Sequence, residues 1–169
     1  GAPVAKWLQS LGISAFELNY RFAPYTYKAI LSDVQRAIRL VRYKAKEFNI
    51  DPQKVAVLGF SAGGHLAMSA ALCPHLAEDF GDAIDKMSAK PDAAILCYPV
   101  VSMCEPYMHE GSRDSFLGNE KDNLELCRSF SGEKIVTDDA PPMFIWHNAD
   151  EKCVSVANSL HLAESLAEN

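Results

Sequence analysis

A serine lies within a five-residue pattern that suits nucleophilic catalysis. The pattern G-F-S-A-G, from Gly59 to Gly63, follows an apolar run at 55–58 that is typical of a strand buried in a parallel sheet. A helix-favouring stretch, 66–72, comes after it. A tight turn between strand and helix lifts the Ser61 hydroxyl above the sheet, and any side chain at Gly59 or Gly63 would crowd this turn. We therefore expect Ser61 to be a nucleophile.

The same turn brings a backbone donor next to the serine. The N–H of Ala62 would lie at the start of the helix, where developing negative charge is stabilised, so Ala62 is the expected oxyanion donor. A phosphate-binding or purely structural glycine-rich turn is the alternative interpretation. Neither G-x-G-x-x-G nor G-K-[ST] lies nearby, which favours catalysis.

The rest of the chain predicts elements that could position this turn. Strands are predicted at 13–20, 55–58, 92–98 and 143–146, and helices at 3–11, 29–48, 66–72 and 155–166. Such alternation indicates an α/β fold with a parallel sheet covered on both sides, and residues 1–169 fit a single domain. Residues 100–139 break the rhythm, with one short helix candidate at 120–130, and we expect them to form a cap over the active site.

Composition and charge limit the classes of partner and compartment. The net charge of −6 and pI near 5.3 disfavour nucleic acid and anionic membranes as partners. The cysteine count is odd and lacks a C-x-x-C pair, which argues against a disulfide framework and a zinc site. We expect reduced thiols, no metal and a cytoplasmic location, with secretion left open. The five cysteines are Cys73, Cys97, Cys104, Cys127 and Cys153.

Several segments together resemble a known family. The segment G-F-S-A-G-G-H-L-A at 59–67 is similar to the nucleophile elbow of α/β-hydrolase esterases, above all the bacterial acetyl-xylan-esterase-like carbohydrate esterases. The resemblance implies a partial α/β-hydrolase fold, with a mostly parallel sheet flanked by helices and a nucleophile elbow. The other similar segments are N-Y-R-F-A-P at 19–24, D-P-Q-K-V at 51–55, Y-P-V at 98–100, P-P-M-F-I-W-H at 141–147 and V-x-N-S-L at 156–160.

The resemblance also implies where the other catalytic groups belong. The family order is Ser, then Asp or Glu, then His, with the acid in the loop that here spans 147–155. Its spacing favours Glu151 over the neighbouring Asp150. The glycine-rich oxyanion loop would precede this chain and the catalytic histidine would follow it, while His65 and His147 are expected to be structural. We therefore expect a domain incomplete at both ends, inactive alone and prone to self-association.

The function implied by the resemblance is ester hydrolysis through an acyl-enzyme on Ser61. The substrate would be a small ester of a short acyl group, with acetyl groups on carbohydrate favoured, and no cofactor would be needed. Two alternatives stay open: a serine peptidase of the prolyl-oligopeptidase type, and a hydrolase-fold binding module without catalysis.

Overall fold

A three-stranded parallel sheet organises residues 1–169, all of which the computed structural model describes. Its strands are β1 (Ala56–Phe60), β2 (Ala93–Cys97) and β3 (Met143–Trp146), in the spatial order β1-β2-β3. In the register of the sheet, Leu58 lies beside Ile95 and Ile95 beside Phe144. The strands predicted at 55–58, 92–98 and 143–146 are therefore confirmed, as is their parallel arrangement.

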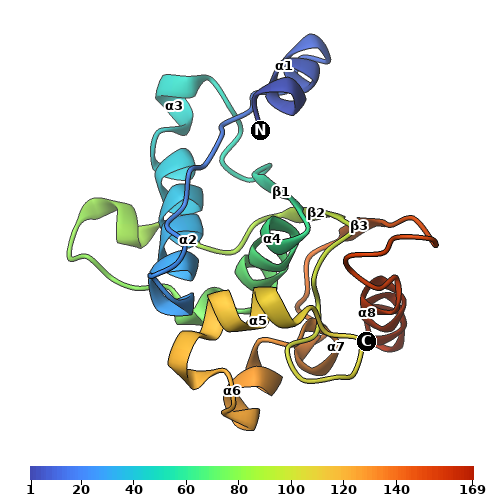
Figure 1. Cartoon of the computed structure of the whole chain (residues 1–169). Coiled ribbons are helices and arrows are strands. Elements are labelled where there is room, and N and C mark those ends of the chain that lie inside the picture. Colours follow the sequence, from blue (N-terminus) through green and yellow to red (C-terminus); the bar gives the residue numbers. More distant parts are fainter.

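Helices cover one face of this sheet (Figure 1). Helix α4 packs on β1 and β2, α8 packs on β3, and α2 lies against α4. None of the helices has the length and apolar character needed to cross a bilayer. The helices are α1 (Ala2–Ser10), α2 (Tyr27–Tyr43), α3 (Ala45–Phe48), α4 (Ala62–Leu72), α5 (Glu110–Leu117), α6 (Leu124–Ser129), α7 (Gly132–Ile135) and α8 (Ala157–Glu168), with short 3₁₀ turns at Pro74–Leu76, Ala83–Lys86 and Gly118–Glu120.

The opposite face of the sheet is open, which corrects the expectation that both faces are covered. Side chains alternate between the two faces of a strand, and Met143 and Ile145 pack toward α4 and α8. Phe144 and Trp146 point the other way and are 63% and 46% exposed. Phe60, at the end of β1, is also exposed, so an apolar surface remains on this face.

The strand predicted at 13–20 is not formed. Residues 13–20 run as irregular chain without a ladder partner, because none of the three strands lies beside them. Their apolar side chains are used differently: the Phe16 ring packs 4.8 Å from that of Phe48 in α3. This contact buries the segment only in part, because Ile13, Phe16 and Leu18 remain 50%, 51% and 39% exposed.

The helix predicted at 29–48 divides into α2 and α3 at Lys44, whose φ and ψ of −93° and 12° leave the helical range. The basic face of α2 binds the acidic connection that follows α4. Arg36 pairs with Asp85 at 2.9 Å, and Arg39 pairs with Asp79 at 3.1 Å. The acidic side chains of the connection at 74–91 thus have basic partners within the chain.

Residues 100–139 contain three helices, where the sequence indicated one. The candidate at 120–130 shortens to α6, while α5 and α7 lie on either side of it. The segment also enters the largest apolar cluster, where it packs with α2 and α4. Its six members in that cluster are Val100, Met103, Phe116, Leu117, Cys127 and Phe130.

Candidate active site

Ser61 has a backbone conformation that residues other than glycine rarely adopt, with φ of 52° and ψ of −118°. It stands between the last residue of β1 and the first residue of α4. The Ser61 N–H donates to the Cys97 carbonyl at 3.0 Å, and the Ser61 carbonyl accepts from Val100 N–H at 3.2 Å. Such a conformation costs roughly 1–3 kcal/mol and persists only where the surroundings hold it. The predicted strand, tight turn and helix are confirmed.

The glycines around Ser61 have unequal roles. A Cβ added at Gly59 would overlap the carbonyl oxygen of Gly63, and one at Gly64 would lie 2.9 Å from the Cβ of Pro99. At Gly63 the nearest atom would be the Tyr20 hydroxyl, at 3.9 Å. The expectation of crowding is therefore confirmed for Gly59 and wrong for Gly63. Gly64 is the second constrained position, because β2 is followed by Pro99 directly against α4.

Ala62 begins α4 and is exposed. The first N–H groups of a helix have no acceptor within it, and the backbone bonds of the turn involve Ser61 N–H and His65 N–H instead. The Ala62 N–H therefore stays available beside Ser61. It lies at the positive end of an 11-residue helix, which is a favourable position for an anionic oxygen.

The loop after β3 holds the two candidate acids in different ways. Glu151 is half-buried, and its Oε1 accepts a hydrogen bond from the Cys153 backbone N–H at 2.8 Å. Its own N–H donates to the Asn148 carbonyl at 3.2 Å. Asp150 is exposed, and its carboxylate makes neither a hydrogen bond nor an ion pair within the chain. The loop thus orders the Glu151 carboxylate and leaves that of Asp150 in solvent.

Ser61 and Glu151 belong to the same edge of the sheet. Each follows the carboxyl end of a parallel strand, Ser61 after β1 and Glu151 after β3, with β2 between them. Two strand spacings correspond to about 10 Å. A serine and a carboxylate at that lateral separation need a third group between them to exchange a proton or share a charge.

Two histidines near these segments make hydrogen-bonding contacts to other parts of the fold. His65 in α4 is 2% exposed, its Nε2 lies 2.9 Å from the Phe130 carbonyl, and burial lowers its pKa to about 4. His147 contacts the Val154 carbonyl through Nε2 at 2.9 Å and the Ser159 hydroxyl through Nδ1 at 2.7 Å. These contacts agree with the structural roles expected from the sequence. His147, the first residue of the loop 147–155 (called the acid loop below), thus contacts Val154 near the other end of the same loop.

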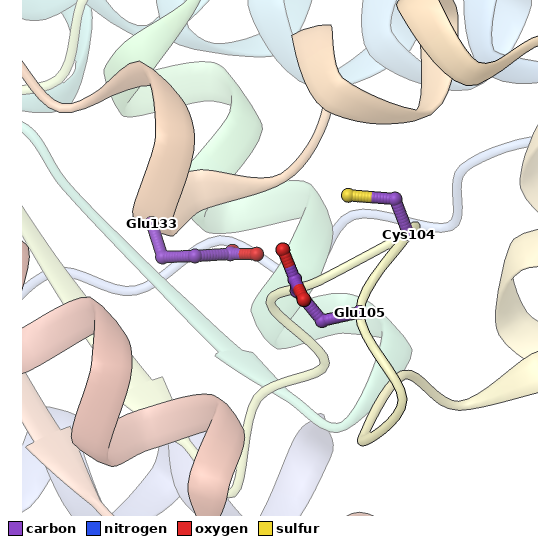
Figure 2. Close-up of side chains that lie close together, drawn as sticks. All are labelled: Cys104, Glu105 and Glu133. Carbon is purple, nitrogen blue, oxygen red and sulfur yellow. The ribbon is translucent and has the colours of Figure 1, made fainter.

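An acidic cluster lies apart from Ser61. Figure 2 shows the carboxylates of Glu105 and Glu133 facing each other, with the Cys104 thiol beside them. Their potential ligand atoms all lie within 4.8 Å of one another. The Lys134 ammonium pairs with Glu105 at 2.8 Å and holds the pKa of that carboxyl below its usual value. The cluster therefore already has a cation from the protein, and we assign no metal to it.

The polar hollow of about 380 Å³ next to this cluster also lies away from the candidate catalytic residues. Neither Ser61 nor the two acids of the loop line it. It is lined by Glu105, Tyr107, Glu133, Lys134, His161, Glu164, Ser165 and Glu168.

Comparison with known proteins identifies the family. The model of the family described as BD-FAE matches residues 2–166. The chain belongs to the BD-FAE family. The esterase family recognised from the elbow and the α/β-hydrolase fold are both confirmed by this match and by the relatives that follow.

Three relatives of this BD-FAE chain carry names that state an activity. Endo-1,4-beta-xylanase B of Butyrivibrio fibrisolvens is 37% identical over 93% of the chain, and the acetylxylan esterase of Xylanibacter ruminicola is 35% identical over 94%. The crystal structure of an acetyl ester-xyloside bifunctional hydrolase from Caldicellulosiruptor lactoaceticus superposes with a TM-score of 0.89, at 46% identity over 99% of the chain. The BD-FAE chain spans 25%, 31% and 61% of these three proteins, respectively.

Sequence reasoning missed two residues that shape the site. Asn158, in the V-x-N-S-L segment, is fully buried, and its Oδ1 accepts from the N–H groups of Val101 and Ser102 at 2.9 and 3.0 Å. His109 contacts Cys153 in the acid loop from a position 44 residues earlier in the chain. The sequence signal for Asn158 was an amide side chain among the apolar residues of the helix predicted at 155–166. No local pattern indicated the pairing of His109 with Cys153.

Proposed function

We propose that this BD-FAE chain carries the nucleophile and the acid of a serine esterase. The observation that carries the proposal is the left-handed backbone of Ser61 at the junction of β1 and α4. A non-glycine residue held at positive φ marks stored strain, and such strain concentrates at functional sites. The position of Ser61 between a parallel strand and the helix that follows supports this role, because α/β-hydrolases carry their nucleophile on such a turn.

The proposed reaction proceeds through an acyl-enzyme. The Ser61 Oγ attacks the ester carbonyl carbon, and a histidine takes the hydroxyl proton. The Ala62 N–H donates to the oxyanion of the tetrahedral intermediate, a contribution of about 3 kcal/mol to the barrier for one such donor. Collapse of the intermediate expels the alcohol, which takes the proton from the histidine. Water then attacks the acyl-enzyme by the same route and releases the acid.

The proposed orienting acid is Glu151, with Asp150 as its competitor. The hydrogen bond from Cys153 N–H fixes one Glu151 oxygen and leaves the other for an imidazole N–H. Among the five histidines, His65 and His147 are bound to carbonyl groups elsewhere. Both ring nitrogens of His109 have partners, Ser112 and Cys153, and His161 pairs with Glu164. His75 lies beyond the C-terminal end of α4, at the opposite end of that helix from Ser61. We therefore place the base outside this chain, and we expect the chain alone to hydrolyse esters no faster than the background.

The proposed substrate is a short acyl ester, with acetyl on a carbohydrate as the favoured case. The names of the acetylxylan esterase and the acetyl ester-xyloside hydrolase support this choice over a peptide substrate. We propose that residues 100–139 form one wall of the acyl or sugar pocket. The contact between His109 and Cys153 supports this, because it brings the start of α5 to the acid loop. Five cysteines that are all free thiols support a cytoplasmic location.

A covalent probe tests the nucleophile separately from substrate choice. By the intact protein we mean this chain together with the segments proposed to supply the base. A fluorophosphonate should label the intact protein at Ser61. The Ser61→Ala variant should lose both the label and turnover of p-nitrophenyl acetate while it stays folded. Ser10→Ala, at an exposed serine of α1, is the matched control and should keep both. Retention of more than a few per cent of activity in pure Ser61→Ala protein would remove Ser61 from this role.

Substitution of each carboxylate by its amide distinguishes the role of Glu151 from that of Asp150. Glu151→Gln should lower kcat of the intact protein by orders of magnitude, because the imidazolium formed in the reaction loses its counter-charge. Asp150→Asn, at the neighbouring solvent-exposed position, should have a much smaller effect. The opposite ranking would transfer the acid role to Asp150.

A further inference from the structure

The side chain of Asn158, in the first turn of α8, uses its complete hydrogen-bonding capacity. Its Oδ1 accepts from the N–H groups of Val101 and Ser102 at 2.9 and 3.0 Å. Its Nδ2 donates to the carbonyls of Tyr107 and Ser155 at 2.9 and 3.1 Å. An amide has two acceptor and two donor sites, so only one orientation of this side chain satisfies all four partners. Because Asn158 is fully buried, it does not itself contact a substrate.

These bonds join the turn of the proposed nucleophile to the acid loop. The Val100 N–H donates to the Ser61 carbonyl at 3.2 Å, and the next two N–H groups along the chain donate to Asn158. Ser155, which accepts from the other end of the same amide, is the last residue of the acid loop. Asn158 therefore lies between the segment bound to Ser61 and the end of the loop that carries Glu151.

The neighbouring residue of α8 holds the beginning of the same loop. The Ser159 hydroxyl lies 2.7 Å from Nδ1 of His147, and Nε2 of that ring lies 2.9 Å from the Val154 carbonyl. The first turn of α8 thus binds both ends of the acid loop through two consecutive side chains. The hydrogen bond that orders the Glu151 carboxylate comes from the far half of the loop, from the Cys153 N–H at 2.8 Å. The orientation of this carboxylate consequently depends on where α8 holds the loop.

The sheet alone does not supply this orientation. The parallel pairing of β2 with β3 holds the chain as far as Trp146. Residues 147–155 contain no strand, so no ladder continues into the acid loop. We propose that Asn158, assisted by Ser159, is a positioning residue that keeps the Glu151 carboxylate directed toward the catalytic base. The inference deepens the proposed esterase function and rests on it.

Gln35 provides a matched control for the loss of a buried amide. It is 1% exposed in α2, and its Nε2 donates to the Cys73 carbonyl at 2.8 Å. Cys73 follows the C-terminal end of α4, whereas Ser61 precedes the N-terminal end of that helix. Gln35→Ala should therefore lower Tm, as Asn158→Ala does, without moving the proposed serine or acid.

The test compares both variants with the wild-type intact protein at a temperature where each is folded. Asn158→Ala should lower kcat for p-nitrophenyl acetate by about 10- to 100-fold, as expected when a reacting group is displaced by about 1 Å. KM should change little, because Asn158 does not reach the substrate. Gln35→Ala should keep both kcat and KM. A fall in kcat for folded Asn158→Ala that is no larger than that for Gln35→Ala would overturn the proposal.

A double-mutant cycle tests whether Asn158 acts through Glu151. The Glu151→Gln protein lacks the carboxylate, so addition of Asn158→Ala should lower kcat much less in this background than in the wild type. An equal factor in the two backgrounds would refute positioning of Glu151. Ser159→Ala removes the contact with His147 at a small change of volume, and it should lower kcat with the same dependence on Glu151. If Asn158→Ala does not fold, an equal factor for Ser159→Ala in the two backgrounds refutes the proposal.

The wild type and Ser61→Ala distinguish failure of this inference from failure of the proposed function. Turnover that is absent from the wild-type intact protein, or that survives in Ser61→Ala, would refute the proposed esterase mechanism and with it the role of Asn158. Turnover that requires Ser61 and does not respond to Asn158→Ala would refute the positioning role alone.

Discussion

The different surroundings of Gly59 and Gly63 allow a test of how the elbow is held. Both glycines lie two residues from Ser61, and the sequence alone treats them as equivalent. In the structure, a methyl group at Gly59 would overlap the Gly63 carbonyl, whereas a methyl group at Gly63 would have free space up to the Tyr20 hydroxyl at 3.9 Å. Gly59→Ala and Gly63→Ala therefore make a matched pair that adds the same atoms on either side of Ser61.

The magnitude follows from what the added methyl group meets. Overpacking against movable side chains costs typically 1–3 kcal/mol. The obstacle at Gly59 is a backbone carbonyl in the first turn of α4 and cannot rotate away, so we expect the upper end, about 3 kcal/mol. For a chain of about 150–250 residues, that lowers Tm by about 6–12 °C, and by less in a longer protein. Gly63 lies inside α4, where alanine exceeds glycine in helix propensity by up to about 1 kcal/mol, so Gly63→Ala should leave Tm unchanged or raise it slightly.

Thermal and urea unfolding of the intact protein and both variants measure these shifts, and fluorophosphonate labelling reports on the turn itself. Gly59→Ala should lose stability and label Ser61 more slowly, since relief of the overlap moves Gly63 and with it the N-terminus of α4. Gly63→Ala should keep both properties. Equal effects of the two substitutions would refute the argument that the crossing of β1 and α4 at Gly59 holds the strained serine.

Three further predictions concern the fold that surrounds the site. Burial lowers the pKa of His65 from its ordinary value of 6.5 to about 4, so the unfolded chain binds the proton first as the pH falls. The free energy of unfolding should drop by up to about 3 kcal/mol between pH of about 6.5 and 4, and His65→Gln should lose that part of the slope in urea titrations. The ring of Phe130 is 1% exposed, and its centroid lies 5.2 Å from those of Tyr27 and Phe116. Phe130→Ala should therefore lower the free energy of unfolding by about 3–5 kcal/mol. A decrease below about 1 kcal/mol would place residues 100–139 outside the core. The open sheet face at Phe144 and Trp146 should make the isolated chain self-associate, with Phe144→Lys reducing the effect; a monodisperse monomer in sedimentation at all concentrations would contradict this.

The elements that form the edge of the sheet with Ser61 could be predicted because their signals are local. Each of the three strands is a short apolar run bounded by turn residues, and the glycine pattern around Ser61 requires one kind of turn. That the carboxyl ends of the strands share one edge then follows from parallel pairing. The loop at 147–155 was indicated by the resemblance to the esterase family rather than by a local signal, and Glu151 as the acid stays a prediction.

What could not be predicted depends on contacts between distant segments. The alternation at 13–20 is as regular as that of a strand, but a strand also needs a neighbour at hydrogen-bonding distance. Helices of four to eight residues, such as α5 and α7, contain too few turns to produce a clear period. The pairing of His109 with Cys153 depends on how α5 meets the acid loop, which no local pattern encodes. Only the three-dimensional packing distinguishes Gly63 from Gly64.

The two halves of the proposed site are connected through the end of β2. Ser61 N–H donates to the Cys97 carbonyl, and Cys97 pairs in register with Trp146 at the end of β3. One residue further, the Tyr98 N–H donates to the Trp146 carbonyl at 2.6 Å, immediately before the acid loop begins at His147. The separation of serine and acid is thus determined by consecutive backbone bonds across one strand. Side chains on this edge can change without moving the proposed serine and acid, whereas a shift in the pairing of β2 with β3 would move Glu151 relative to Ser61.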